Sequence, residues 1–181
     1  VQLNPVDMET RMRLVSLYLE GQAPDKAART LDELAIGLRT SGDEEQLVDV
    51  LDRLAGIAEE PTGYLKELAE IYLERGENAQ ALQRLQRCFK VNPQDEQTLD
   101  LLGKAFVELG ETDKALQVFE ELARVVEARG DVDRLAEIDA ILERLAPSAS
   151  TPTAPADDGG LGQAAELMAA MSLPRWCPRT P

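Results

Sequence analysis

The sequence has no histidine and only two cysteines among its 181 residues. Histidine is the most frequent general base near neutral pH and the commonest metal ligand, so its absence weighs against catalysis and against a metal site. Cys88 and Cys177 lie far apart, without the spacing of metal ligands, and we expect Cys88 to be a buried packing residue. We therefore predict a protein that is not an enzyme and that binds no cofactor.

Aromatic and basic residues are also scarce. Phe, Trp and Tyr make up 4% of the chain while the hydrophobic residues make up 44%, so Leu and Ala must supply the core. Lys and Arg number 19 against 34 Asp and Glu, which gives a formal net charge of −15. This charge disfavours attraction to a nucleic-acid backbone or to an anionic membrane. We predict a protein partner with a basic or apolar surface, and no nucleic acid.

Long apolar runs are missing as well. None approaches the ~20 residues of a membrane-spanning helix, and no signal peptide is visible, so we predict no membrane span and a cytoplasmic location. Val1 is not an initiator methionine, and Leu3-Asn4-Pro5 resembles Val91-Asn92-Pro93, which closes a later repeat. We expect the chain to be a fragment of a longer protein.

The residues from Thr62 to Glu96 follow an ordered pattern of large, small and turn-forming side chains. The series is Leu65-x2-Leu68-Ala69-x2-Tyr72, then Gly76, Ala81-x3-Leu85 and Pro93. Most of it recurs at a constant shift in residue number as Leu99-x2-Leu102-Gly103-x2-Phe106, Gly110 and Ala115-x3-Phe119. Pattern and period resemble the tetratricopeptide repeat (TPR) family, whose unit is a pair of antiparallel helices of about 34 residues. The resemblance implies an all-α, TPR-like solenoid of helical hairpins that forms a right-handed superhelix.

We place TPR units at 8–41, 62–95 and 96–129. The first is the weakest match, because Arg11, Val15 and Gln22 replace the expected large, small and glycine residues. The residues left over before the second unit carry an apolar stripe that predicts an extra helix at 43–58, and a similar stripe predicts another at 131–146. In residues 1–146 we therefore expect eight helices, near 6–20, 24–40, 43–58, 62–75, 78–91, 95–109, 112–129 and 131–146.

The composition changes after residue 146. Residues 147–160 are rich in Pro, Ser, Thr, Ala and Gly, and we expect a disordered linker there. In residues 161–181 we expect a short amphipathic segment and tail, with Leu167, Met168, Met171 and Trp176 as its docking residues. We predict that this tail docks in an apolar groove, either of the same chain or of a neighbouring copy, which would give self-association. The alternatives are docking on a different protein and a disordered end.

In the TPR family the first helix of each repeat lines a concave groove, so the resemblance implies an adaptor or scaffold that binds another protein. The partner would be a peptide, an amphipathic helix or a folded surface such as that of a small GTPase. The groove residues that the resemblance implies are Met12, Leu19, Glu20, Lys66, Glu70, Leu73, Glu74, Asp100, Lys104, Val107 and Glu108.

Two rows stand out among these groove residues. One is an apolar strip of Leu19, Leu73 and Val107, and the other is an acidic strip of Glu20, Glu74 and Glu108. The acidic strip fits a solvated helix face equally well. The alternative function is a structural module for self-assembly or oligomerisation.

Overall fold

A computed structural model describes residues 5–146, which form eight α-helices and contain no β-strand. The helices are α1 (Pro5–Glu20), α2 (Pro24–Ser41), α3 (Glu44–Ile57), α4 (Thr62–Glu74), α5 (Asn78–Val91), α6 (Glu96–Glu108), α7 (Thr112–Arg129) and α8 (Val132–Leu145). All eight predicted helices are present, and each end lies within one residue of its predicted position. The predicted linker and the tail residues Leu167, Met168, Met171 and Trp176 lie outside the described residues.

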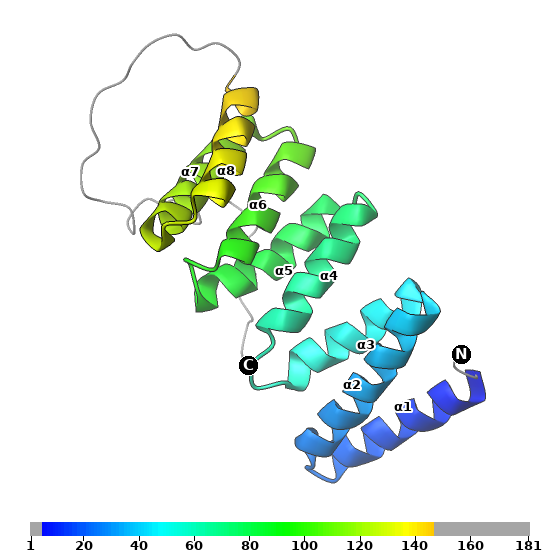
Figure 1. The fold of residues 1–181 in the computed structure, drawn as a ribbon. Helices are drawn as coiled ribbons and strands as arrows, with labels where there is room; N and C mark the ends of the chain where they lie inside the picture. Colours follow the sequence, from blue (N-terminus) through cyan, green and yellow to red (C-terminus); the bar gives the residue numbers. More distant parts are fainter. Residues whose placement is uncertain (1–4, 147–181) are drawn as a thin grey trace, which may run out of the picture.

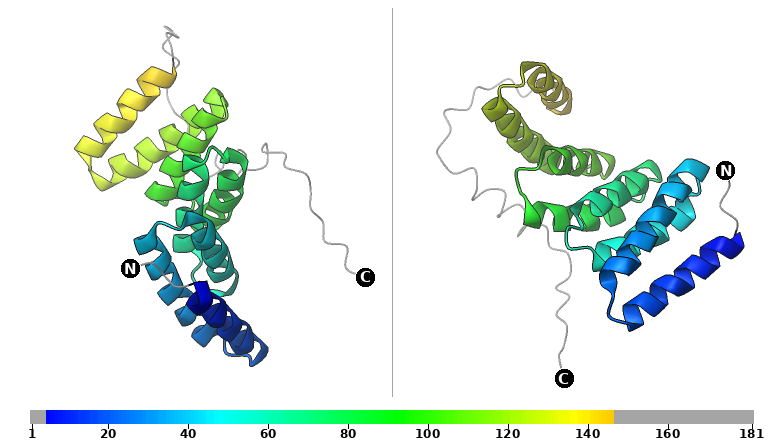
Figure 2. Two further views of the ribbon diagram at one scale, coloured as in Figure 1. Left: turned by 90° about the vertical axis from the view of Figure 1, so that its right-hand side faces the viewer. Right: turned by 60° about the horizontal axis from the view of Figure 1, so that its bottom comes forward.

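The helices pack one after another into an elongated all-α solenoid (Figure 1). Figure 2 shows α1 and α8 at opposite ends of this array. Each helix contacts its neighbours in sequence, and α4 also contacts α6 directly. Within the described residues, α1 packs on α2 alone. None of the described helices is long and apolar enough to cross a membrane.

Three glycines at the same position of successive repeats form equivalent turns. Gly42, Gly76 and Gly110 have φ angles of 74°, 73° and 73°, in the left-handed region where glycine is favoured. They join α2 to α3, α4 to α5 and α6 to α7. Each of these three helix pairs is therefore one hairpin of a regular repeat.

The buried side chains repeat with the same spacing as these glycines. Leu31, Leu65 and Leu99 have exposed fractions of 0%, 1% and 1%. Other buried positions that recur in three successive repeats are Leu34, Leu68 and Leu102, then Leu38, Tyr72 and Phe106, and Leu51, Leu85 and Phe119. We therefore place the first repeat at 28–61, in place of the predicted unit at 8–41. The helix predicted as an extra one at 43–58 is α3, the second helix of this regular hairpin.

Polar contacts between every second helix show two layers. Tyr64 on α4 donates a hydrogen bond to Asp32 on α2, at 2.9 Å between the oxygens. On the other layer, the guanidinium of Arg84 on α5 donates to Asp52 on α3 at 2.9 Å. α2 and α4 are thus joined by a polar contact on one layer, and α3 and α5 on the other.

Aspartate side chains begin three of the helices. Asp43, Asp95 and Asp131 each accept a hydrogen bond from the backbone N–H three residues later, at 3.2, 2.9 and 3.1 Å. Each bond satisfies an N–H that has no partner within the helix. These caps fix where α3, α6 and α8 start.

Candidate protein-binding surface

Most of the predicted groove residues fall on one surface, which we call the even-helix face. Residues at i, i+4, i+7 and i+8 share one side of a helix. On α4 they are Lys66, Glu70, Leu73 and Glu74, and at the equivalent positions of α6 they are Asp100, Lys104, Val107 and Glu108. The equivalent residues on α2, which were not among the predicted groove residues, are Asp32, Ile36, Arg39 and Thr40.

The three predicted residues of α1 lie away from this face. Because α1 packs on α2 and on no other described helix, it does not extend the row formed by α4 and α6. Met12 is half-buried against the core, while Leu19 is 42% exposed and Glu20 is exposed. The predicted apolar and acidic strips therefore do not begin at Leu19 and Glu20, since the first helix of the first repeat is α2.

A sequence signal for the α2 face was available. Leu31-x2-Leu34-Ala35-x2-Leu38, followed by Gly42, stands one full repeat before the pattern that begins at Leu65. It is less conspicuous because Leu38 stands where the later repeats have Tyr72 and Phe106. The α2 part of the even-helix face includes an exposed apolar residue, Ile36, with 62% of its area exposed.

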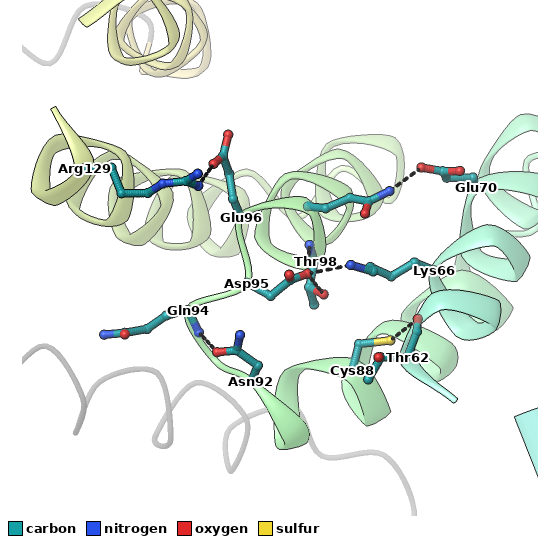
Figure 3. Close-up of polar contacts among 11 residues, drawn as sticks. Thr62, Lys66, Glu70, Cys88, Asn92, Gln94, Asp95, Glu96, Thr98 and Arg129 are labelled. Atoms are coloured by element: carbon teal, nitrogen blue, oxygen red, sulfur yellow. Dashed lines mark hydrogen bonds and ion pairs between the residues drawn. The ribbon is translucent and has the colours of Figure 1, made fainter. Parts of the chain in front are cut away.

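Lys66 is engaged within the chain. Its Nζ lies 3.2 Å from Oδ2 of Asp95, the capping residue of α6 (Figure 3). The same carboxylate oxygen accepts from the backbone N–H and the hydroxyl of Thr98, at 2.9 and 2.6 Å. Burial raises the pKa of Asp95, but the hydrogen bonds from Thr98 and the Lys66 ammonium outweigh it, so the pKa lies below its usual value. Lys66 therefore ties α4 to the start of α6.

Asp100 is also held by neighbouring side chains. Its side chain is 14% exposed and accepts a hydrogen bond from the Arg134 guanidinium of α8 at 2.9 Å. Lys104 lies one turn further along α6, with its Nζ 2.7 Å from the other carboxylate oxygen. Asp100 thus links α6 to α8, whereas Lys104 remains 57% exposed.

A shallow pocket of about 260 Å³ lies between α2, the start of α3 and α4. Its floor is apolar and buried, made by Leu38, Leu47 and Ile71. Its rim is acidic, with one arginine among four glutamates: Arg39, Glu44, Glu67, Glu70 and Glu74.

The rim charges are only partly compensated. Arg39 binds both carboxylate oxygens of Glu67 at 2.6 Å, and Glu44 lies 3.4 Å from the Arg75 guanidinium. Glu70 accepts a single neutral hydrogen bond, 3.1 Å long, from the amide of Gln97 (Figure 3). Glu74 forms no hydrogen bond or ion pair with any other residue between 5 and 146. The pocket therefore keeps two uncompensated carboxylates.

An apolar floor beneath such a rim suits a long cationic side chain, whose methylenes contact the floor and whose charged end meets the carboxylates. The volume is smaller than the roughly 300 Å³ at the lower end of small-molecule sites. No group of three or more metal-ligating side chains comes together in residues 5–146. The pocket thus has the size and charge to anchor one basic side chain of a protein.

Comparisons with known proteins support the fold and give the family. The TPR domain of Sgt2 from Aspergillus fumigatus superposes with a TM-score of 0.53 at 19% identity, covering 72% of this chain and 89% of that one. MamA from Desulfovibrio magneticus RS-1 gives a TM-score of 0.46 at 17% identity, covering 79% of this chain and 97% of that one. No curated protein matches the chain.

The likeness to Sgt2 shows a TPR-like fold and does not place the chain in the TPR family. The model of the family described as bacterial transcriptional activator domain matches residues 7–145, which include all eight helices apart from the first two residues of α1. The chain therefore belongs to the bacterial transcriptional activator domain family.

Proposed function

We propose that this domain is a protein-binding adaptor in a regulatory protein, and that its even-helix face binds a basic, amphipathic segment of the partner. The observation that carries the proposal is the pocket between α2 and α4, where Glu70 and Glu74 stand over an apolar floor without a cationic neighbour of their own. A lysine or arginine of the partner would supply the missing positive charge.

Charge favours a protein rather than DNA as the partner. Residues 147–181 carry three acidic side chains and two arginines, so residues 1–146 hold −14 of the net charge of −15. Such a surface repels a phosphate backbone. The family description concerns activation of transcription, and we assign to this domain the contacts with other proteins in that process.

A few exposed apolar side chains would supply the binding affinity, and the acidic side chains would steer the partner toward this face. Ile36 and Val107, 62% and 37% exposed, are apolar contacts on the even-helix face. Glu74 and Glu108 occupy equivalent exposed positions on α4 and α6 and would steer a basic partner during association. The partner would be a peptide or a helix of a larger protein.

The proposal is tested by comparing two charge-reversed variants as baits in extracts of the source cells. One carries Glu70→Lys and Glu74→Lys on the even-helix face, and the other carries Glu120→Lys and Glu127→Lys on α7. Both change the net charge equally. A partner retained by the wild type and the α7 variant, but lost from the even-helix variant, supports the proposal. Equal retention by the two variants contradicts it.

A second candidate function, self-assembly, is favoured by α1. Leu14 and Leu17 are 39% and 56% exposed on a helix whose formal charge is only −1. In an antiparallel pair of α1 helices from two copies, these leucines would meet while Arg13 lies near Glu20 of the other copy. Sedimentation over a concentration series tests this: a dimer abolished by Leu17→Lys supports it, and a monomer at all concentrations contradicts it.

A further inference from the structure

The acidic pocket is specific to the junction between α2 and α4. One repeat later, the junction between α4 and α6 has Leu101, Lys104 and Ala105 where the pocket has Glu67, Glu70 and Ile71. Glu74 alone keeps an acidic counterpart there, Glu108. The same fold thus presents one strongly acidic pocket next to a junction that carries a lysine.

A complementary segment exists in the same chain. Residues 161–181 contain one glutamate and two arginines, a charge of +1, whereas residues 1–160 carry −16. Arg175 is followed by Trp176, which is the single tryptophan of the chain. An arginine beside a large aromatic residue combines two of the side chains that most often anchor a protein interface.

We propose that Arg175 and Trp176 dock at this pocket within the same chain. The Arg175 guanidinium lies against the carboxylates of Glu70 and Glu74, and the Trp176 ring covers Ile36. Ile36 is on the same side of α2 as Arg39, which lines the pocket, and its 62% exposure leaves room for such a contact. The tail then occupies the site that an external basic partner would need, so it acts as an internal competitor.

The length of the intervening chain permits this contact. Trp176 follows Ala146 by thirty positions, which gives a root-mean-square reach of roughly 30 Å for a flexible chain. Packed helices are about 8–10 Å apart, so the pocket between α2 and α4, which is two to three such spacings from α8, is roughly 16–30 Å away. A flexible tether matched to its span gives an effective concentration on the order of millimolar. Modest intrinsic affinity is therefore enough for docking.

This inference uses the pocket of the proposed function but requires no external partner. Its test uses the full chain alone, so its failure would leave the proposed function standing. Trp176 supplies the readout, because all tryptophan fluorescence comes from the tail.

We expect the emission of the full chain to lie at shorter wavelength than that of a free peptide of residues 161–181, and acrylamide quenching to be several-fold weaker. Glu70→Lys with Glu74→Lys should abolish both differences, and so should Arg175→Glu, which leaves the helical array untouched. The matched control is Glu108→Lys, the equivalent of Glu74 one repeat later, and it should retain them. Combining Arg175→Glu with Glu70→Lys and Glu74→Lys should restore part of the protection.

Three results would overturn the proposal. The first is a wild-type emission identical to that of the free peptide. The second is a protected tryptophan that responds to neither the pocket variant nor Arg175→Glu, because the tail would then dock elsewhere. The third is protection that increases with protein concentration, which would assign the contact to a second copy.

Discussion

Gly103 on α6 lies directly against the ring of Phe119 on α7, so that a Cβ atom at position 103 would be only 2.5 Å from Cζ of the ring. In the preceding repeat the equivalent residues are Ala69 and Leu85, both with 0% exposure. The larger ring in one hairpin is thus matched by the smaller residue facing it.

This relationship predicts a non-additive effect on stability. Gly103→Ala should destabilise the array by about 1–3 kcal/mol, because the added methyl overpacks a buried contact. Gly103→Ala combined with Phe119→Leu recreates the pair of the preceding repeat and should be more stable than the sum of the single changes. Chemical denaturation followed by circular dichroism measures all three variants. Strict additivity would show that the two positions do not share a contact.

The Asp95 cap predicts a second change in stability. Asp95→Ala removes the acceptor for the Thr98 N–H and should cost about 1 kcal/mol, as expected for an N-cap. Asp95→Asn keeps an acceptor and loses the charge that faces Lys66, so its smaller loss separates the cap from the ion pair. If the two variants were equally destabilised, the cap bond would contribute nothing beyond the ion pair.

The lowered pKa of Asp95 also predicts a pH dependence. Because the folded pKa is below the ordinary value of 3.8, the unfolded chain binds a proton more readily than the folded one. The stabilisation of the fold by the Asp95 carboxylate is therefore complete above the ordinary pKa of an aspartate. It is lost as the pH falls through the pKa of Asp95 in the folded protein. Unfolding free energies measured from pH 6 to pH 3 should decrease more steeply for the wild type than for Asp95→Asn. Parallel curves would contradict the assignment.

Substitutions at a buried position and at an exposed position should separate effects on stability from effects on partner binding. Tyr72→Ala removes a side chain with 6% exposure and should cost roughly 3–5 kcal/mol. Val107→Asp changes a residue with 37% exposure and should leave the melting temperature nearly unchanged while weakening partner binding. Leu73 does not serve this purpose, because it is half-buried against the core. A large loss of stability in Val107→Asp would mean that α6 is rotated from the position described.

The helix boundaries followed from sequence because local signals set them. Glycines with positive φ, capping aspartates and apolar stripes all act within one helix, and Gly42 with Asp43 is an example. The register of the first repeat was less visible, because Leu38 and Leu47 replace the aromatic and small residues of the later repeats. Three equally spaced glycines show it once the turns are known.

The contacts of the candidate site were less predictable, because the side chains that pair with one another come from distant segments of the chain. Lys66 pairs with a residue 29 positions later, and Asp100 with one 34 positions later. Spacing within one helix places both residues on the even-helix face but does not show that Asp95 and Arg134 reach them. The pocket depends in the same way on how α2 and α4 meet, which only the packed structure shows.

Electrostatic steering predicts a change in association rate. Glu74→Lys with Glu108→Lys should slow association with a basic partner and make the rate less sensitive to salt, since long-range attraction is screened by ions. Stopped-flow measurements at low and high salt compare this variant with Glu120→Lys and Glu127→Lys on α7. Identical rates at low salt for both variants would assign the acidic residues to solvation.

Site-specific photo-crosslinking is the most direct test of the claim that the even-helix face binds the partner. A crosslinking side chain would replace Val107 on α6 in one variant and Val91 at the end of α5 in the other, both of which are exposed valines. The partner retained by the wild-type protein should be crosslinked from position 107 and not from position 91. Crosslinking from position 91 alone, with none from position 107, would place the partner on the opposite layer and contradict the account.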